Sequence, residues 1–235
     1  MKKTHIVLAV LIIALTVVNA CKHEIPDPAA GSGAPDPNPV TLPGGSTLVC
    51  FESQILPLFQ SNCAKSGCHD AASRQKGYVF DTYANIVKKD VRPGRADDSK
   101  VYKVLFETGD KKMPRPPNPD LTPAQKALIG KWINEGARNT VNCGTSCDSS
   151  QFKYGANVAP LISTYCLGCH SGGAPSGGIN LSTYIGVRNV ALSGRLVGAV
   201  SHAPGYSPMP KNAGKLSPCQ ITQITKWVNA GALNN

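Results

Sequence analysis

Apolar side chains at helical spacing close each half of the chain. The first set precedes Gly136 and consists of Ala127, Leu128, Ile129, Trp132 and Ile133. The second set precedes Gly231 and consists of Ile221, Ile224, Trp227 and Val228. A Thr-Pro pair at 122–123 and a Ser-Pro pair at 217–218 stand before the two sets, and a hydroxyl followed by proline is typical of a helix N-terminus. We therefore predict two helices that begin at these pairs and stop at the glycines.

The apolar and polar pattern before these helices also occurs twice. The segment LPLFQSNC, which ends at Cys63, aligns with APLISTYC, which ends at Cys166. GYVFDTY from Gly77 aligns with GINLSTY from Gly178, and each glycine lies eight residues after a histidine. Both copies continue through a loop-rich middle to a Met-Pro pair and then to the tryptophan helix. The sequence therefore predicts a mainly α protein of two tandem domains, residues 48–143 and 144–235.

The N-terminal residues have the pattern of an export signal. A basic pair, KK, precedes an apolar run at 6–18 that is short for a membrane-spanning helix. The sequence VNAC resembles a bacterial lipobox, so we expect residues 1–20 to be removed and Cys21 to be acylated. An ordinary signal peptide that leaves Cys21 unmodified is the alternative. Residues 21–47 are rich in proline and glycine, and we predict a flexible tether without secondary structure.

The charge of the chain narrows the choice of partners. The 24 Lys and Arg against 14 Asp and Glu give a formal net charge of +10, to which the signal peptide contributes two lysines. An exported chain without a dense basic run is not expected to bind nucleic acid. A basic surface favours an acidic protein partner, although a solvated face or an anionic membrane explains the same balance.

Residues 166–170, CLGCH, carry the clearest chemical signature. The thiols of Cys166 and Cys169 have the spacing needed to add to the two vinyl groups of a haem, and His170 then lies beneath the ring, where it can bind the iron. A zinc site, a thioredoxin-like redox pair and a Cys166–Cys169 disulfide are the competing interpretations. A structural zinc site needs four ligands, and a thioredoxin-like pair needs a βαβ context. A disulfide between Cys166 and Cys169 would close a small, strained loop. We therefore predict covalently bound haem c.

Residues 63–69, CAKSGCH, repeat this motif with four residues between the cysteines. The alignment has no gap on either side of that loop. We therefore expect the two additional residues to bulge, and Cys63, Cys68 and His69 to hold a second haem c. Two alternatives stay open: Cys68 alone holds the haem, or the site is empty.

Two methionines are candidates for the second ligand of each haem iron. After Met1, Met113 and Met209 are the only methionines, each precedes proline, and both occupy the same place in their repeat. A thioether is a soft ligand that raises the potential of haem iron. We therefore predict that these two methionines are the second axial ligands. His202, seven residues before Met209, is the alternative ligand for the second haem.

Together these features resemble the class I c-type cytochromes, and in particular the planctomycete-type family of small exported haem domains. The resemblance covers nearly all of residues 48–235 and rests on LPLFQSNC, Cys-x-x-Cys-His, Met-Pro and the helix LTPAQKALIGKWINEGA. It implies a small α-helical fold around each haem, in which the first and last helices cross. It also implies thioether links at Cys63, Cys68, Cys166 and Cys169, proximal ligation by His69 and His170, and distal ligation by Met113 and Met209.

Four further cysteines are left in the mature chain. Cys50 and Cys143 bound the first repeat, whereas Cys147 begins the second repeat and Cys219 begins its last helix. An even number of remaining cysteines in an exported chain favours disulfides, and four cysteines allow three pairings. We predict Cys50–Cys143 and Cys147–Cys219, because each bond would then join the start of a repeat to its end.

The expected function follows from the ligand set. An iron with both axial positions filled has no room for substrate, so we expect an electron carrier and not an enzyme. Lys22 follows Cys21 in place of the aspartate that favours inner-membrane retention, which indicates anchorage to the outer membrane where one exists. We expect a redox protein as partner. A dihaem peroxidase with one open haem, and a haem module for docking or sensing, are the alternatives.

Overall fold

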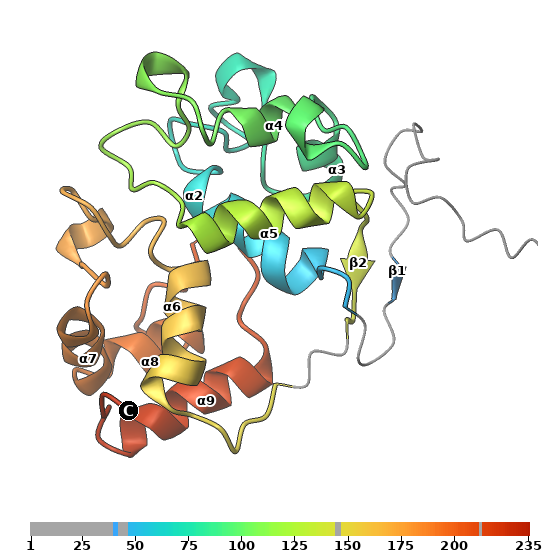
Figure 1. Cartoon of the computed structure of the whole chain (residues 1–235). Helices are drawn as coiled ribbons and strands as arrows, with labels where there is room; N and C mark the ends of the chain where they lie inside the picture. The colour runs from blue at the N-terminus through green and yellow to red at the C-terminus, as the bar shows by residue number, and fades with distance from the viewer. Residues whose placement is uncertain (1–39, 42–46, 144–146, 212) are drawn as a thin grey trace, which may run out of the picture. The chain divides into compact units, whose positions relative to one another are not determined.

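The computed structural model of the protein describes residues 40–41, 47–143, 147–211 and 213–235, and these residues are mainly helical (Figure 1). The coarse prediction of a mainly α protein is therefore confirmed. The helical elements of the first half are η1 (Phe51–Ile55), α2 (Leu56–Asn62), η2 (Gln75–Gly77), α3 (Tyr83–Val87), η3 (Ala96–Asp98), α4 (Lys100–Lys103), η4 (Gly109–Lys111) and α5 (Pro123–Asn134). Those of the second half are η5 (Tyr154–Val158), α6 (Ala159–Tyr165), η6 (Ser176–Gly178), α7 (Tyr184–Leu192), α8 (Arg195–Val200) and α9 (Pro218–Asn229).

The two predicted tryptophan helices are α5 and α9. The Thr122 hydroxyl accepts a hydrogen bond from the Gln125 backbone N–H, and the Gln125 side chain accepts one from the Thr122 backbone in return. Ser217 and Gln220 make the same reciprocal pair at the start of α9. Such a capping box satisfies two of the backbone donors that a helix leaves free at its N-terminus. The predicted starts are confirmed, and each helix ends two residues before the predicted glycine.

The first and last helices of each half are joined by aromatic side chains. The ring centroids of Phe51 and Trp132 lie 5.4 Å apart, and those of Tyr154 and Trp227 also lie 5.4 Å apart. Figure 1 shows the helix that contains α2 passing behind α5. The resemblance implies such an arrangement of first and last helices.

Side-chain hydrogen bonds show that the sequence repeat is also a structural repeat. The Tyr83 hydroxyl donates to the Ala137 carbonyl at 2.8 Å, and the equivalent Tyr184 donates to the Ala232 carbonyl at 2.7 Å. The indole N–H groups of Trp132 and Trp227 each donate to a backbone carbonyl six residues further along the chain, at 3.0 and 2.8 Å. Each half also has its own buried hydrophobic cluster, although the described residues of both halves belong to one compact unit.

The middle of the second repeat is more helical than the sequence analysis predicts. Helices α7 and α8 together occupy most of residues 184–200, and the equivalent part of the first repeat holds the shorter α3 and α4. The Thr183 and Thr82 hydroxyls each accept a hydrogen bond from the backbone N–H three residues later, which caps α7 and α3. The loop-rich description therefore fits the first repeat better than the second.

Two short strands correct the prediction for residues 21–47. Strand β1 (Val40–Thr41) pairs in parallel with β2 (Thr140–Val141), and the Val40 N–H donates to the Asn139 carbonyl at 2.8 Å. The prediction of no secondary structure is wrong here, because the β-branched residues Val40–Thr41 of the predicted tether pair with Thr140–Val141, near the end of the first repeat. The predicted signal peptide, Cys21 and the remainder of the tether up to residue 39 lie outside the described residues. None of the helices among the described residues combines the length and the hydrophobicity that a membrane span requires.

The structure contains the disulfides Cys50–Cys143 and Cys147–Cys219, with Cα–Cα distances of 5.8 and 6.0 Å. These are the two pairs that the sequence analysis predicts. Neither bond joins one repeat to the other, so each half is closed by its own covalent link. The four cysteines of the two histidine motifs are free.

We expect the double variant Cys50→Ala/Cys143→Ala to lower the free energy of unfolding by about 2–5 kcal/mol, because the lost bond no longer restrains the unfolded chain. The two cysteines are 93 residues apart, whereas Cys147 and Cys219 are 72 apart, so Cys147→Ala/Cys219→Ala is expected to cost slightly less. Urea unfolding followed by circular dichroism measures both effects. An unfolding midpoint equal to that of the wild type would contradict the prediction.

Candidate functional site

The second histidine motif forms one tight turn at the end of α6. Cys166 follows the last residue of that helix, and its backbone N–H still donates to the Ile162 carbonyl at 2.9 Å. The Cys166 carbonyl then accepts from the N–H groups of Cys169, at 3.1 Å, and His170, at 2.9 Å. These bonds hold Cys166, Cys169 and His170 on one turn, where all three residues are partly buried.

The first motif shares the helix end and the histidine hydrogen bond of this turn in spite of its longer loop. The Cys63 N–H donates to the Phe59 carbonyl at 2.8 Å, and the His69 N–H donates to the Cys63 carbonyl at 3.2 Å, as in the second motif. Ser66 and Gly67 are exposed, and Gly67 has a φ of +80°, which favours glycine. The two additional residues therefore bulge outward, as predicted, and the histidine keeps its position after the helix.

The chain returns to each motif through equivalent hydrogen bonds. The Cys68 and Cys169 carbonyls accept from Gln75 and Ser176, both at 2.9 Å. The carbonyl of His69 accepts from Phe80 at 2.9 Å, and that of His170 accepts from Leu181 at 2.7 Å. The loop that follows each histidine is thus anchored in the same way in both repeats.

The histidine rings differ in their contacts. In the second motif, Nδ1 of His170 lies 3.3 Å from the Ile179 carbonyl, and a donor bond there leaves Nε2 available to a metal. In the first motif, Nδ1 of His69 is buried and has no hydrogen-bond partner in the described structure. Burial lowers the pKa of His69, and the nearby carbonyls of Gln75 and Tyr78 partly offset that effect. The imidazole therefore favours the neutral form, which is the form that binds metals.

Three of the four motif thiols have raised pKa values and therefore favour the uncharged form. Burial raises the pKa of Cys63 to about 12, an effect that Lys65 partly offsets, and burial raises the pKa of Cys166 to about 12 as well. Burial also raises the pKa of Cys169. Because thiolates are the species that form disulfides and bind metals, thiols with raised pKa values stay reduced more readily. The structure has no disulfide within either motif, in contrast to one of the competing interpretations.

The two methionines occupy equivalent positions. The Met113 N–H donates to the Val104 carbonyl at 2.9 Å, and the Met209 N–H donates to the Ala199 carbonyl at 3.0 Å. Both side chains are partly buried. The alternative ligand, His202, has its Nε2 3.1 Å from the Met209 carbonyl, so this nitrogen is engaged by the backbone of the methionine loop.

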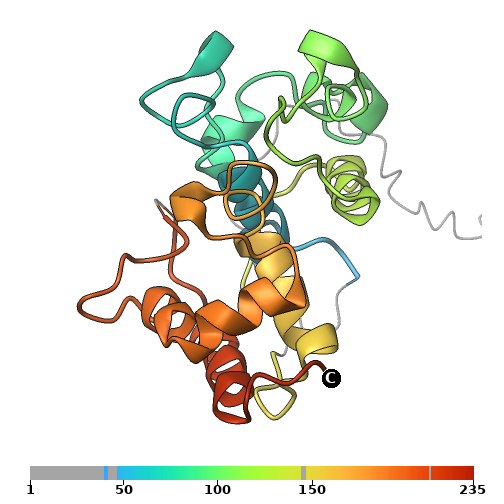
Figure 2. The ribbon, with the colours of Figure 1, turned by 90° about the vertical axis from the view of Figure 1, so that its left-hand side faces the viewer.

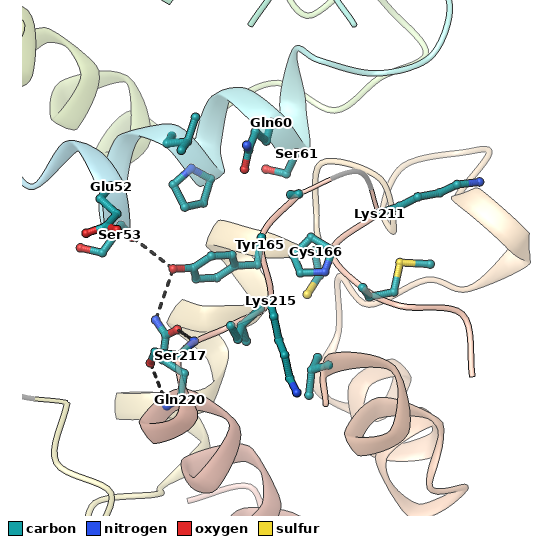
Figure 3. Close-up of a pocket in the computed structure, with 18 of the residues that line it drawn as sticks. Glu52, Ser53, Gln60, Ser61, Tyr165, Cys166, Lys211, Lys215, Ser217 and Gln220 are labelled. Carbon is teal, nitrogen blue, oxygen red and sulfur yellow. Dashed lines mark hydrogen bonds between the residues drawn. The ribbon is translucent and has the colours of Figure 1, made fainter. Parts of the chain in front are cut away.

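A cavity of about 680 Å³, which Figure 3 shows with Cys166 at its lining, lies at the second site. Its lining includes the four predicted side chains Cys166, Cys169, His170 and Met209. Cavities of about 300–1,000 Å³ are typical of small-molecule and cofactor sites. The candidate residues of the first site, Cys63, Cys68, His69 and Met113, are not among the residues that line this cavity.

One wall of the cavity comes from the other repeat. Figure 3 shows Glu52, Ser53, Gln60 and Ser61, which belong to η1 and α2, facing Tyr165 and Cys166. The Tyr165 hydroxyl donates to the Ser53 carbonyl at 3.2 Å and accepts from Gln220 at 3.3 Å. Sequence reasoning missed this wall, because the repeat pattern describes each half by itself and carries no signal for their packing.

The donor set beside the cavity fits a covalently attached haem. It offers two reduced thiols, an imidazole whose Nδ1 faces a carbonyl, and a thioether. The first repeat also offers two free thiols, an imidazole and a thioether, but Nδ1 of its His69 has no hydrogen-bond partner in the described structure. The described residues contain no group of three or more His, Cys, Asp or Glu side chains placed to hold a metal ion directly. A haem needs only one such side chain from each motif, because the porphyrin supplies the other ligands.

Comparison with protein-family models, curated proteins and solved structures finds no match for this chain.

Proposed function

We propose that the protein is an exported, membrane-tethered dihaem c-type cytochrome that transfers electrons between redox partners. The observation that carries the proposal is the duplicated attachment turn. In both repeats a helix ends at a cysteine whose carbonyl accepts from the backbone N–H of the motif histidine, at 3.2 Å in the first repeat and 2.9 Å in the second. A methionine in equivalent loops accompanies each turn, and in the second repeat all four side chains line one cavity.

Each repeat would hold one haem through its own residues. Cys166 and Cys169 would form the thioether links of the second haem, with His170 and Met209 as axial ligands. Cys63, Cys68, His69 and Met113 would have these roles in the first repeat. A bound haem supplies one-electron redox chemistry at its iron.

The proposed ligands suit electron transfer for two reasons: the backbone orients the His170 ring, and a histidine and a methionine together would leave the iron no room for a substrate. The Ile179 carbonyl orients the His170 ring, and such outer-shell hydrogen bonds fix the ligating nitrogen of a histidine. A haem held by both a histidine and a methionine would have no coordination position left for a substrate. This distinguishes the proposal from a dihaem peroxidase and from a ligand-sensing module, both of which need an open or displaceable position.

The proposed location and partner rest on the sequence. Acylation of Cys21 would tether the folded repeats to a membrane, and Lys22 favours the outer membrane over the inner membrane. Without the two lysines of the signal peptide, the mature chain has 22 Lys and Arg against 14 Asp and Glu, a formal net charge of +8 that favours an acidic redox partner. Association with such a partner would slow as the salt concentration rises.

The proposal is tested on the mature protein made in a host that matures c-type cytochromes. We expect its mass to include two covalently attached haems, and its oxidised spectrum to show the near-infrared band of methionine ligation. The reduced protein should bind carbon monoxide poorly and should not turn over peroxide. A colourless protein, or one with a single haem per chain, would contradict the proposal, and peroxide turnover would favour the peroxidase.

A further inference from the structure

The two attachment segments lie directly against each other. Gly168, which stands between Cys166 and Cys169, is buried, and a Cβ atom placed on it would lie 2.2 Å from the Ser61 carbonyl oxygen. Its φ is not positive, so glycine is needed here for close approach and not for backbone conformation. The sulfur of Cys169 lies 3.5 Å from the same carbonyl oxygen.

Ser61 belongs to the first site. It precedes Cys63 by two residues at the end of α2, and consecutive Cα atoms are about 3.8 Å apart, so the Cα atoms of Ser61 and Cys63 are at most about 7.6 Å apart. An atom that would attach the second haem therefore contacts the backbone next to a residue that would attach the first. Figure 2 shows α2 and α6 meeting in this region.

Several other contacts fix this arrangement. The Ser61 hydroxyl donates to the Thr164 carbonyl at 3.0 Å, and the Gln125 side chain donates to the Ser163 carbonyl at 3.3 Å. On the other side of the motif, a Cβ atom on Gly172 would lie 3.3 Å from the Pro117 carbonyl oxygen, in the loop that follows Met113. The second attachment segment is thus held by α2, α5 and the methionine loop of the first repeat.

We infer that the two attachment segments form one electron-transfer unit, in which the contact between Ser61 and Gly168 sets the separation of the two haems. One electron passes within a single chain, from the site that is reduced to the site that is oxidised, and no bond forms or breaks. The first site would then be oxidised by one electron and the second reduced by one, or the reverse. This inference rests on the proposed function.

Electron paramagnetic resonance tests the inference on the complete, haem-loaded chain. In the fully oxidised protein both irons are paramagnetic, and we expect their spectra to be broadened by spin–spin interaction that disappears when one site is reduced. After rapid partial reduction, we also expect the electron to equilibrate between the sites at a rate that does not depend on protein concentration. Neither readout needs a partner or a turnover assay.

The variant Gly168→Ala forces the two segments apart, because its Cβ atom cannot occupy the space beside Ser61. We expect loss of the spin–spin broadening and slower intramolecular equilibration. Gly173→Ala is the matched control in the same loop, since nothing lies within 4 Å of a Cβ atom on Gly173. It should behave as the wild type.

The outcomes separate the inference from the proposed function. A wild-type chain with two haems but without broadening or intramolecular equilibration would overturn the inference and leave the proposed function standing. Unchanged broadening in Gly168→Ala would show that the contact between Ser61 and Gly168 does not set the separation of the haems.

If Gly168→Ala fails to retain its second haem, Ser61→Ala/Tyr165→Phe takes its place, because it removes two hydrogen bonds between the repeats without adding an atom. Weaker broadening in that variant supports the inference, and unchanged broadening overturns it.

Discussion

Replacing Cys166 and Cys169 together with serine is expected to leave one covalently attached haem per chain instead of two. A serine hydroxyl does not form the thioether link, and no other free cysteine is close in sequence to His170. The mass of the denatured mature protein measures the covalent haem content directly. The loss of a whole cofactor makes this effect large and easy to detect.

The variant Cys63→Ser/Cys68→Ser is the matched test of the first site. It should also carry one haem, because the His69 N–H donates to the Cys63 carbonyl as the His170 N–H donates to the Cys166 carbonyl. If the wild type and this variant both carried a single haem, the first site would be empty and the dihaem proposal would be wrong. A chain with Cys63 alone changed to serine distinguishes attachment by two cysteines from attachment by Cys68 only.

Replacing Trp227 with alanine is expected to lower the free energy of unfolding of the second half by about 3–5 kcal/mol. The side chain is 1% exposed and packs against Tyr154, and its indole N–H donates to the Leu233 carbonyl at 2.8 Å. Alanine would leave a cavity and an unpaired carbonyl. Urea unfolding monitored by circular dichroism measures the loss, and Trp132→Ala should give a similar loss in the first half.

Leu192→Ala is the control for this prediction. Leu192 is also apolar and lies in α7 of the same half, but it is 50% exposed. Its replacement should change the free energy of unfolding by no more than about 0.5 kcal/mol. Equal effects for Trp227→Ala and Leu192→Ala would show that the first and last helices of the repeat do not depend on the tryptophan contact.

Local signals in the sequence predicted the features that depend on local chemistry. The starts of α5 and α9 follow from a hydroxyl and a proline at the N-terminus, and the structure adds that Gln125 and Gln220 complete both capping boxes. The bulge after Cys63 follows from the conformational freedom of glycine at Gly67. The disulfide pairs follow from the position of each cysteine at an end of its repeat.

Features that depend on packing between distant segments could not be predicted. Helix α7 was missed because the exposed Ile185 and Leu192 blur its apolar face, and the pairing of β1 with β2 involves residues about one hundred positions apart. The wall that Glu52 and Ser53 form beside the second site belongs to the other repeat. Aligning the chain on itself shows only features that both repeats have. The β1–β2 pairing and the contact between the repeats have no counterpart in the alignment.

The disulfides of this protein have a consequence for its modularity. Each disulfide joins two cysteines of the same repeat. A protease that cuts between Cys143 and Cys147 would therefore produce two fragments with no covalent bond between them. Each fragment would keep its own cross-link, its histidine motif and its methionine. Only non-covalent contacts such as those of Ser61 and Gln125 would then keep the fragments together. One repeat could therefore be exchanged or removed without breaking the covalent framework of the other, but removal of the first repeat would take away one wall of the second site's cavity.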